Sequence, residues 1–417
     1  MSFQQGLSGL NAATKSLEAI GNNVANAGTV GFKQSQVQFS DVYANSLVGS
    51  GGGAQIGIGT QVSRVAQQFS QGNVTASNNP LDMAINGGGF FRMSDNGAIS
   101  YSRNGQFILS KEGYIESASG QRLTGYLANA NGTVAIGAPA ELHIDKADLA
   151  PAATSTYELK LTLDSRKAVQ PAASFDATDP TTFANSTSAK VYDSLGNSHD
   201  LRTFYVKTAS GAAGATWTVF ATVDEVPIGY VPPAAPVAIG TMDFNNGGVL
   251  TGTTPAPLVA NIAVTSGAAT PFTVSIDSTG TQQFAQDFGV AKQLPDGYPA
   301  GTLIGFSVAT NGEIVGRYTN GESNILGQVI LSSFANPNGL QNIGDNQWVE
   351  TADSGAPLTS TPGSSGLGAV QSSRVEDSNV DLTAELVNMI TAQRYYQANA
   401  QTIKTQDQIL QTLVNLR

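Results

Sequence analysis

Apolar residues recur alternately every three and four positions at both ends of the chain, which is the pattern of a helix that buries one side. We expect a C-terminal helix over residues 378–417, with Ser378 as its N-cap. Two adjacent lines of residues seven apart predict its buried seam: Leu382, Met389, Tyr396, Ile403 and Leu410 in one line, and Leu386, Gln393, Ala400, Asp407 and Val414 in the other.

The N-terminal stretch has the same spacing and is expected to end at a C-cap glycine, Gly28. Its apolar stripe comprises Phe3, Gly6, Leu10, Ala13, Leu17, Ile20, Val24 and Ala27. Small and polar residues dilute both seams, so we expect neither helix to be stable alone. The prediction is that the helices pair with each other and then with neighbouring copies, through Phe3, Leu10, Leu17, Ile20, Val24, Leu382, Leu386, Met389, Tyr396, Ile403, Leu410 and Val414.

The C-terminal helix carries little charge on its polar side. From Leu386 to the end of the chain, the charged side chains are Arg394, Lys404, Asp407 and Arg417. A solvated surface helix usually carries denser charge pairs. We therefore expect protein on more than one side of this helix, the alternative being an ordinary amphipathic core helix.

Between the ends, short apolar runs alternate with Gly and Asn turn signals, which predicts antiparallel β structure. The expected fold is multidomain, with paired, coiled-coil-like N- and C-terminal α-helices enclosing nested all-β domains. Stretches rich in Ser, Thr, Pro and Gly, such as 171–182 and 359–368, are expected to be loops or linkers. The expected domains are 1–30 with 378–417 (terminal helices), 31–72 with 353–377 (a connecting region), 73–145 with 291–352 (an inner β domain) and 146–290 (an inserted outer β domain).

Composition narrows the possible classes. Only 12% of the 417 residues are charged, and the net charge is −11, with no basic residue between Lys207 and Lys292. A nucleic-acid partner is therefore not expected, because phosphates require basic patches. The chain has no cysteine for disulfides or thiolate metal sites, and no apolar run of membrane-spanning length. The N-terminus also lacks the features of a cleaved signal peptide, so we expect any export to use another route.

Candidate catalytic chemistry is sparse. The two histidines, His143 and His199, are far apart, and the acids near His199 do not follow the spacing of an EF-hand loop. A weak metal site there is the alternative to a solvated loop. Asp82 and Glu376 are expected to serve in a turn and a helix cap. We therefore expect no enzyme activity, no cofactor and no metal.

Four blocks of the sequence carry a family resemblance. The first runs from Asn22, Asn23 and Asn26 to Gly31, Phe32 and Lys33, and the second surrounds Gly87–Phe91. A third, hairpin block contains Tyr101 and Arg103. The last contains Glu376, Ser378, Asn379, Asp381, Glu385, Gln393 and Arg394. Together these blocks resemble the bacterial flagellar rod and hook proteins, and the long insertion, with the 191–201 block, resembles the hook members.

The resemblance implies a structural subunit that polymerises into a flexible, curved extracellular tube. The tube would couple the flagellar rod to the filament and transmit torque as a universal joint. The implied partners are further copies of the chain, the rod, the hook–filament junction protein, and, during assembly, the hook cap protein and the type III export apparatus. Two alternatives stay open here: a distal rod protein of the same family, or a secreted β-domain adhesin on a helical stalk.

Overall fold

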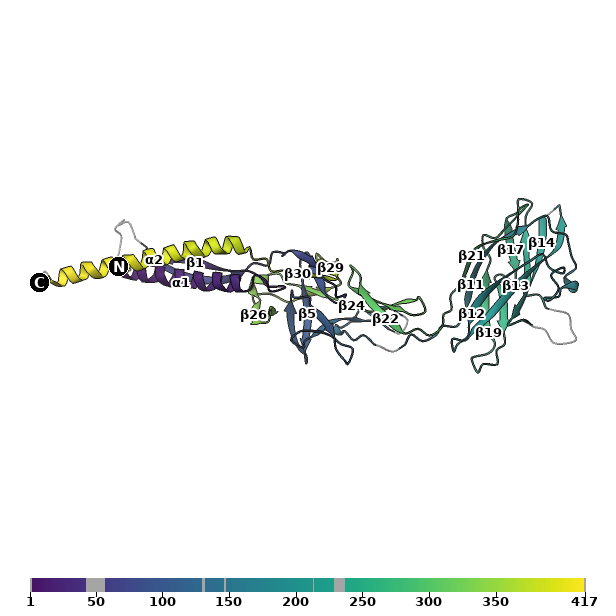
Figure 1. The fold of residues 1–417 in the computed structure, drawn as a ribbon, viewed down its shortest axis with the longest axis horizontal. Helices are drawn as coiled ribbons and strands as arrows, with labels where there is room; N and C mark the ends of the chain where they lie inside the picture. The colour runs from purple at the N-terminus through teal and green to yellow at the C-terminus, as the bar shows by residue number, and fades with distance from the viewer. Residues whose placement is uncertain are drawn as a thin grey trace. The chain divides into compact units, whose positions relative to one another are not determined.

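The computed structural model describes residues 2–42, 57–129, 132–145, 148–212, 214–228 and 237–415. The chain forms two compact units. The first unit comprises Met1–Lys146, Gly305–Gly316 and Ser323–Arg417, and the second comprises Ala147–Ile304 and Arg317–Glu322. The first unit is built from segments that are distant in sequence, as the purple and yellow helices side by side in Figure 1 show.

Two long helices, α1 (Ser2–Ala25) and α2 (Leu382–Asn415), lie side by side in the first unit (Figure 1). They run antiparallel: a Cβ atom on Gly6 would lie 3.0 Å from Ile403, and one on Gly9 would lie 2.7 Å from Asn399. Glycine therefore lets the two helix backbones approach closely. Neither helix in the described ranges has the length and apolarity needed to cross a membrane.

The helix ends differ from the sequence prediction. The Asp381 carboxylate accepts the N–H groups of Thr383 (2.9 Å) and Ala384 (3.1 Å), so α2 begins one turn later than expected and Ser378 is not its N-cap. At the other end, α1 stops at Ala25, so Ala27 lies outside it. The left-handed glycine after α1 is Gly31, with φ 73°, and not Gly28.

A β-hairpin lies along α1. Strands β1 (Ser35–Val42) and β2 (Gly59–Gln67) pair antiparallel, and the segment between them falls outside the described residues, as does most of the glycine-rich stretch 50–59. The Asn23 side chain exchanges two 2.9 Å hydrogen bonds with the backbone of Ser35, and Gln5 donates to the Gly57 carbonyl (2.6 Å). The predicted connecting region is thus an ordered hairpin held against the first helix.

The rest of the first unit is β structure. Its largest sheet has the strand order β22-β23-β24-β9-β5-β6-β27-β26, and the pairs β3–β30 and β4–β29 join early and late parts of the chain. Phe90, Tyr101, Phe334 and Trp348 form an aromatic core on this sheet. The strands are β3 Val74–Ala76, β4 Met83–Asn86, β5 Phe90–Asp95, β6 Ala98–Ser102, β7 Phe107–Leu109, β8 Ile115–Ser117, β9 Arg122–Leu127, β10 Ala140–Glu141, β22 Leu303–Val308, β23 Glu313–Tyr318, β24 Ser323–Val329, β25 Leu331–Ser333, β26 Gln341–Gly344, β27 Gln347–Val349, β28 Leu358–Ser360, β29 Ala369–Ser372 and β30 Arg374–Glu376, with a 3₁₀ turn at Pro337–Gly339.

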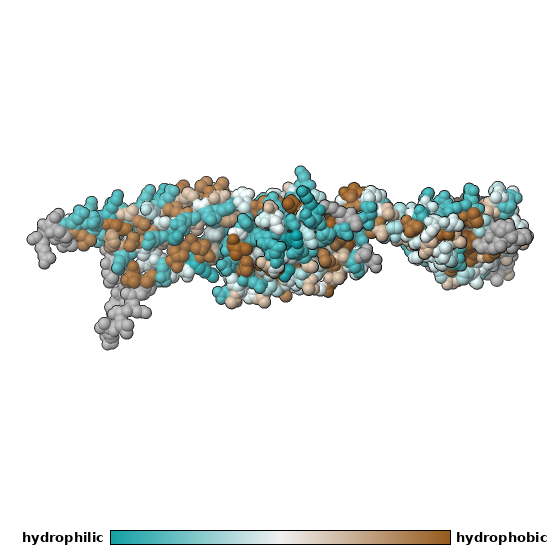
Figure 2. Space-filling model, turned by 90° about the horizontal axis from the view of Figure 1, so that it is seen from below, coloured by the Kyte–Doolittle hydropathy of each residue, from teal (hydrophilic) through white to brown (hydrophobic). Residues whose placement is uncertain are grey.

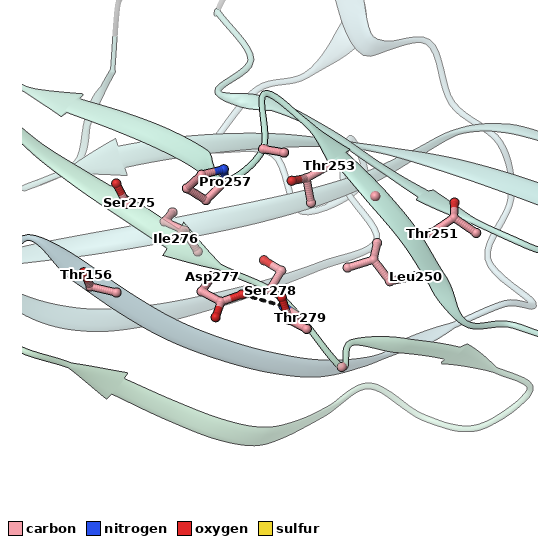
Figure 3. A pocket seen from close by; sticks show the side chains of 13 residues that line it. Thr156, Leu250, Thr251, Thr253, Pro257, Ser275, Ile276, Asp277, Ser278 and Thr279 are labelled. Carbon is pink, nitrogen blue, oxygen red and sulfur yellow. Dashed lines mark hydrogen bonds between the residues drawn. The ribbon is translucent and has the colours of Figure 1, made fainter.

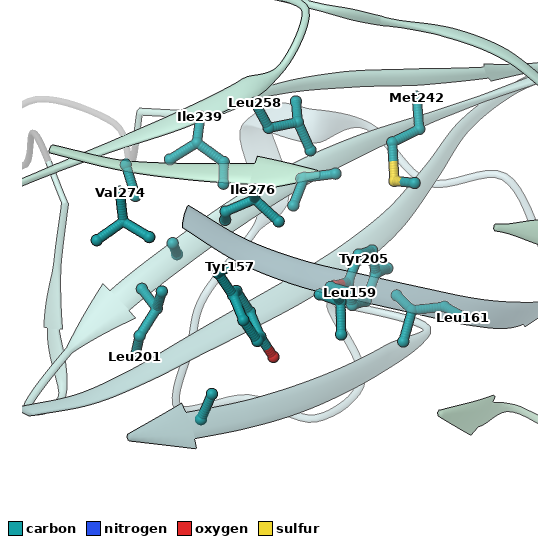
Figure 4. Close-up of a cluster of buried hydrophobic side chains, with 14 of the residues drawn as sticks. Tyr157, Leu159, Leu161, Leu201, Tyr205, Ile239, Met242, Leu258, Val274 and Ile276 are labelled. Carbon is teal, nitrogen blue, oxygen red and sulfur yellow. The ribbon is translucent and has the colours of Figure 1, made fainter. Parts of the chain in front are cut away.

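The second unit is a β-sandwich. One sheet has the order β18-β19-β11-β20 with β21 paired to β11, and the other has the order β12-β13-β14-β16-β17 with β15 paired to β14. Apolar side chains from both sheets, including Leu159, Leu201 and Trp217, fill the space between them (Figure 4). The strands are β11 Thr156–Asp164, β12 Asn185–Tyr192, β13 Ser198–Gly211, β14 Gly214–Val223, β15 Val226–Pro227, β16 Gly240–Phe244, β17 Leu250–Thr254, β18 Leu258–Ile262, β19 Phe272–Asp277, β20 Gln282–Phe284 and β21 Gly289–Pro295, with a 3₁₀ turn at Ala172–Ser174.

Two predictions are corrected by these pairings. Strand β21 pairs with β11 from Tyr157↔Pro295 to Thr162↔Gly289, so residues 291–304 belong to the second unit and not to the inner β domain. Segment 171–182 is a loop between strands, as predicted, and it covers one sheet of the sandwich, where Phe175 stacks on Phe220 with ring centroids 4.2 Å apart. Segment 359–368 is not a free linker, because β28 pairs with β25 and Leu367 is buried.

Candidate assembly surface

On the side of α2 that faces α1, one of the two predicted lines is shifted by one residue, whereas Met389 and Ile403 of the other line are half-buried and Ile403 meets Gly6. Glu385 and Ala392 are buried, and Asn399 and Gln406, which continue their seven-residue line, are half-buried. The predicted line one position on is exposed at Leu386, Gln393 and Asp407. Glycine on α1 shapes this seam, because Ile403 lies against Gly6 and Asn399 lies against Gly9, where a larger α1 side chain would leave no room for them.

The residues predicted for assembly therefore divide into two groups. Ile20 is buried, and Leu10, Leu17, Val24, Met389 and Ile403 are half-buried. Phe3, Leu382, Leu386, Tyr396 and Leu410 are exposed, and the side chain of Val414 lies outside the described residues. The first group contributes to packing within one chain, whereas the second remains available to other molecules.

Further exposed apolar side chains that were not predicted, such as Val387 and Ile390, extend the predicted set on the same elements. On α2, Leu382, Leu386 and Ile390 follow each other at intervals of four, with Val387 beside them, so they form one continuous stripe. Figure 2 shows apolar side chains gathered over the part of the molecule built from the terminal helices. We use the name assembly surface for the exposed apolar residues of α1, α2 and the hairpin: Phe3, Leu7, Phe39, Val62, Val65, Leu382, Leu386, Val387, Ile390, Tyr395, Tyr396, Ile409 and Leu410.

A buried ion cluster joins the helices to the β structure. Both side chains of the Lys33–Glu376 pair have an exposed fraction of 0%, with Nζ 2.6 Å from Oε1, and Arg103 lies 3.1 Å from the other carboxylate oxygen. Burial lowers the pKa of Lys33 and of Arg103, and the Glu376 charge opposes this shift. The sequence predicted Glu376 to be a helix cap, and this prediction is wrong because its carboxylate binds Lys33 and Arg103. No local sequence signal could have revealed an ion pair between residues so far apart in the chain.

The other signature residues mostly hold the same junction. Asn379 accepts the Gln34 N–H (2.8 Å) and donates to the Gln68 carbonyl (2.7 Å). Asn26 bonds back to Asn22, and Phe32 is half-buried. Gly31 packs against the Asn104 backbone, where a Cβ atom would lie only 2.5 Å from the amide nitrogen. Gln393 and Arg394, by contrast, are exposed on α2.

The polar clusters around Asp82 and His199 hold turns and strand ends of the β structure together. Asp82 accepts hydrogen bonds from Ser77 and Asn79 in a turn, separately from Glu376. His199 lies between Asp193 (3.4 Å) and Asp224 (2.7 Å), not beside Asp200 as its position in sequence suggested. Burial opposes the charged imidazole, but the two aspartates outweigh this effect and raise the pKa of His199. Across the described ranges, no group of three or more potential ligands is arranged to hold a metal.

The second unit also has a hollow of about 600 Å³ lined mainly by Ser and Thr (Figure 3). Its one carboxylate, that of Asp277, accepts the backbone N–H of Thr279 (2.9 Å). That side chain therefore serves the turn in which it lies.

Comparison with known proteins decides the family. Four family models match in order: flagella basal body rod protein at residues 3–33, flagellar hook protein FlgE/F/G D1 domain at 84–154, flagellar basal body protein FlaE D2 domain at 162–298, and flagellar basal body rod FlgEFG protein C-terminal at 371–416. The chain is 39% identical to the flagellar hook protein FlgE of Salmonella typhimurium and 38% identical to that of Escherichia coli, each over 100% of both chains. The chain belongs to the flagellar hook protein FlgE family.

This membership confirms the prediction of a structural subunit of the flagellar hook. The FlgE protein of Borreliella burgdorferi is 30% identical over 100% of this chain. The crystal structure of Helicobacter pylori flagellar hook protein FlgE2 covers 71% of the chain with a TM-score of 0.54 and 14% identity, which shows a shared fold. The hook family accounts for both the terminal helices and the mostly β body.

Proposed function

We propose that this hook protein polymerises through its assembly surface, with the terminal helices forming the inner wall of a tube. The observation that carries the proposal is the stripe of Leu382, Leu386 and Ile390, which lies on α2 away from its seam with α1. A stripe of this length costs free energy in water, and packing against like copies removes it. The coiled-coil-like pairing of α1 with α2 would then continue between neighbouring molecules.

The proposed interface contains the residues predicted from the sequence, in two roles. The buried and half-buried residues hold α1 against α2 within one chain, and the exposed residues contact other copies of the chain. The proposed layout assigns 1–30 with 378–417 to the tube wall, the hairpin and ion cluster to a connecting region, the β part of the first unit to an inner domain, and the second unit to an outer domain that also includes residues 291–304.

The same proposal extends to mechanics. Bending of the tube as a universal joint requires outer contacts that change length while inner contacts hold. The low charge of the chain, 12% of its residues, favours wet contacts without fixed ion pairs, which slide at small energetic cost. We infer the partners by the same reasoning from the family: the rod, the hook–filament junction protein, the hook cap protein and the type III export apparatus, which would deliver the chain outside the cell without a cleaved signal.

Electron microscopy of the concentrated protein tests the central point. Hollow tubes of uniform diameter are the expected result. Discrete oligomers would instead favour a stalked adhesin, and persistent monomers at high concentration would contradict the proposed polymer. Since the assembly surface is confined to the helices and hairpin, the β parts should keep their fold in every case.

A further inference from the structure

Glu385, in the first turn of α2, is a buried carboxylate with one unused oxygen. The side chain is 2% exposed, and its Oε1 accepts the side-chain amide of Gln34. Its Oε2 has no hydrogen-bond partner among the described residues. A buried carboxylate oxygen without a donor costs free energy, so this atom is suited to receive a donor from outside the chain.

Glu385 lines a groove of about 560 Å³ between α1, α2 and the start of β1. The walls include Asn23 from α1 and Asn388 and Tyr395 from α2. Among the described residues that line it, Glu385 is the one charged group. The groove therefore favours a cation, and the Tyr395 ring at its side suits a planar guanidinium, which binds well over aromatic faces.

The same helix carries a cation that lacks a partner. Arg394 is exposed and makes no ion pair or hydrogen bond within the described parts of the chain. It follows Glu385 by nine residues, which at 3.6 residues per turn places it roughly on the opposite face of α2. One copy thus cannot join its own Arg394 to its own Glu385, whereas two copies packed face to back can.

We propose that Arg394 of one copy enters the groove of the next copy and forms an ion pair with the Oε2 atom of Glu385. This inference rests on the proposed polymerisation and names a contact within it. A head-to-tail contact of this kind leaves a free groove at one end and a free arginine at the other, so it repeats without closing into a dimer. The guanidinium would supply the donor that the carboxylate lacks.

The test is a double-mutant cycle on the critical concentration for polymerisation, measured by sedimentation of tubes. Glu385→Gln keeps the Oε1 acceptor for Gln34 and removes the charge; Arg394→Gln removes the other charge. We expect each to raise the critical concentration at least about 30-fold, because losing one partner of a buried charge pair costs about 2 kcal/mol or more. The double variant should be no worse than either single one. Lys404→Gln is the matched control, since Lys404 is also an exposed cation of α2, and should change the value by less than about twofold.

The outcomes separate this contact from the polymer itself. Suppose that the wild type forms tubes. The contact alone is then overturned if Glu385→Gln polymerises at an unchanged critical concentration, or if the free-energy losses of the two single variants add up in the double variant. A wild type that never forms tubes overturns the proposed function and the contact with it. If Glu385→Gln does not fold, cross-linking decides: the chain has no cysteine, so Asn388→Cys and Gln397→Cys copies can be copolymerised and oxidised. Disulfide-linked pairs support the contact, and their absence from formed tubes overturns it.

Discussion

The Nζ atom of Lys33 lies 2.6 Å from the Oε1 atom of Glu376, although 343 residues separate the two in the chain. Lys33 follows α1 and Glu376 ends β30, shortly before α2. The backbone repeats the link, because the Gly31 N–H donates to the Glu376 carbonyl (2.8 Å). The segments next to both terminal helices are therefore joined to each other and to the β structure at a buried ion cluster that also includes Arg103.

Removing the central charge of this cluster should destabilise the first unit. Glu376→Gln leaves Lys33 and Arg103 buried without a counter-charge, so we expect the free energy of unfolding to fall by about 3–5 kcal/mol. Denaturant unfolding followed by Trp348 fluorescence, in a Trp217→Phe background, measures this unit alone, because the two tryptophans lie in different units. Glu18→Gln breaks an exposed pair with Lys15 and should cost less than about 1 kcal/mol. Equal losses in the two variants would rule out a special role for the cluster.

The glycines of α1 give opposite predictions at two positions. Gly6→Leu places a side chain where the Cβ atom already meets Ile403 at 3.0 Å, so α1 should separate from α2 at a cost of about 1–3 kcal/mol. Gly21→Ala has nothing within 4 Å and should stabilise the helix by about 1 kcal/mol. Amide hydrogen exchange of α1 in the assembled protein should therefore speed up in the first variant and slow in the second. Faster exchange in both would contradict the helix pairing.

The exposed end of α2 should matter for polymerisation and not for folding. Deleting residues 410–417 removes Leu410 from the assembly surface but leaves Ile403 against α1, so we expect no tubes by electron microscopy and unchanged thermal unfolding of both β parts. A smaller change is the substitution Leu410→Asp, which should prevent tube formation. Its control is Gln411→Asp, which changes a neighbouring exposed polar residue and should leave tube formation intact. Normal tube yield from the deletion would refute the role of this segment.

His199 should make the stability of the second unit depend on pH. The pKa of His199 is raised in the folded state, so its protonation stabilises the fold below its unfolded pKa of about 6.5, and this stabilisation is lost as pH rises through the higher folded value. Thermal unfolding read by Trp217 fluorescence should therefore show a falling midpoint as pH rises from about 6.5. His199→Gln should flatten this dependence while His143→Gln, in the first unit, leaves it in place. A midpoint that rises over the same range would show the sign to be wrong.

Local patterns predicted the elements of the fold better than their contacts. The three-and-four spacing located both terminal helices, and Asn-Gly and Asp-Asn-Gly signals located the hairpins around Asn96 and Asn311. The start of α2 differs from the predicted one because Ser378 and Asp381 are both residue types that cap helices well. The conformation of the chain between them decides which of the two is the N-cap. One predicted line of the α2 seam is shifted by one residue, because the spacing of apolar residues gives the helical period and not the close approach to α1 that Gly6 and Gly9 permit.

The ion cluster and the groove depend on distant parts of the chain meeting. Lys33, Arg103 and Glu376 each lie in a short block that resembles the family, yet each block by itself contains an ordinary charged residue. Their pairing requires the fold to bring the two ends together. The burial of Glu385 against Gln34 follows from the position of the hairpin, which no pattern within α2 encodes.

Gly6 rests against Ile403, so this side of α1 is covered by α2, a helix almost 400 residues further along the chain. A ribosome that stops early releases a fragment whose opening helix has lost its only long helical neighbour among the described segments, however well its β parts fold. Such a fragment would expose to water the side of α1 at Gly6 and Gly9 that Ile403 and Asn399 cover in the folded chain.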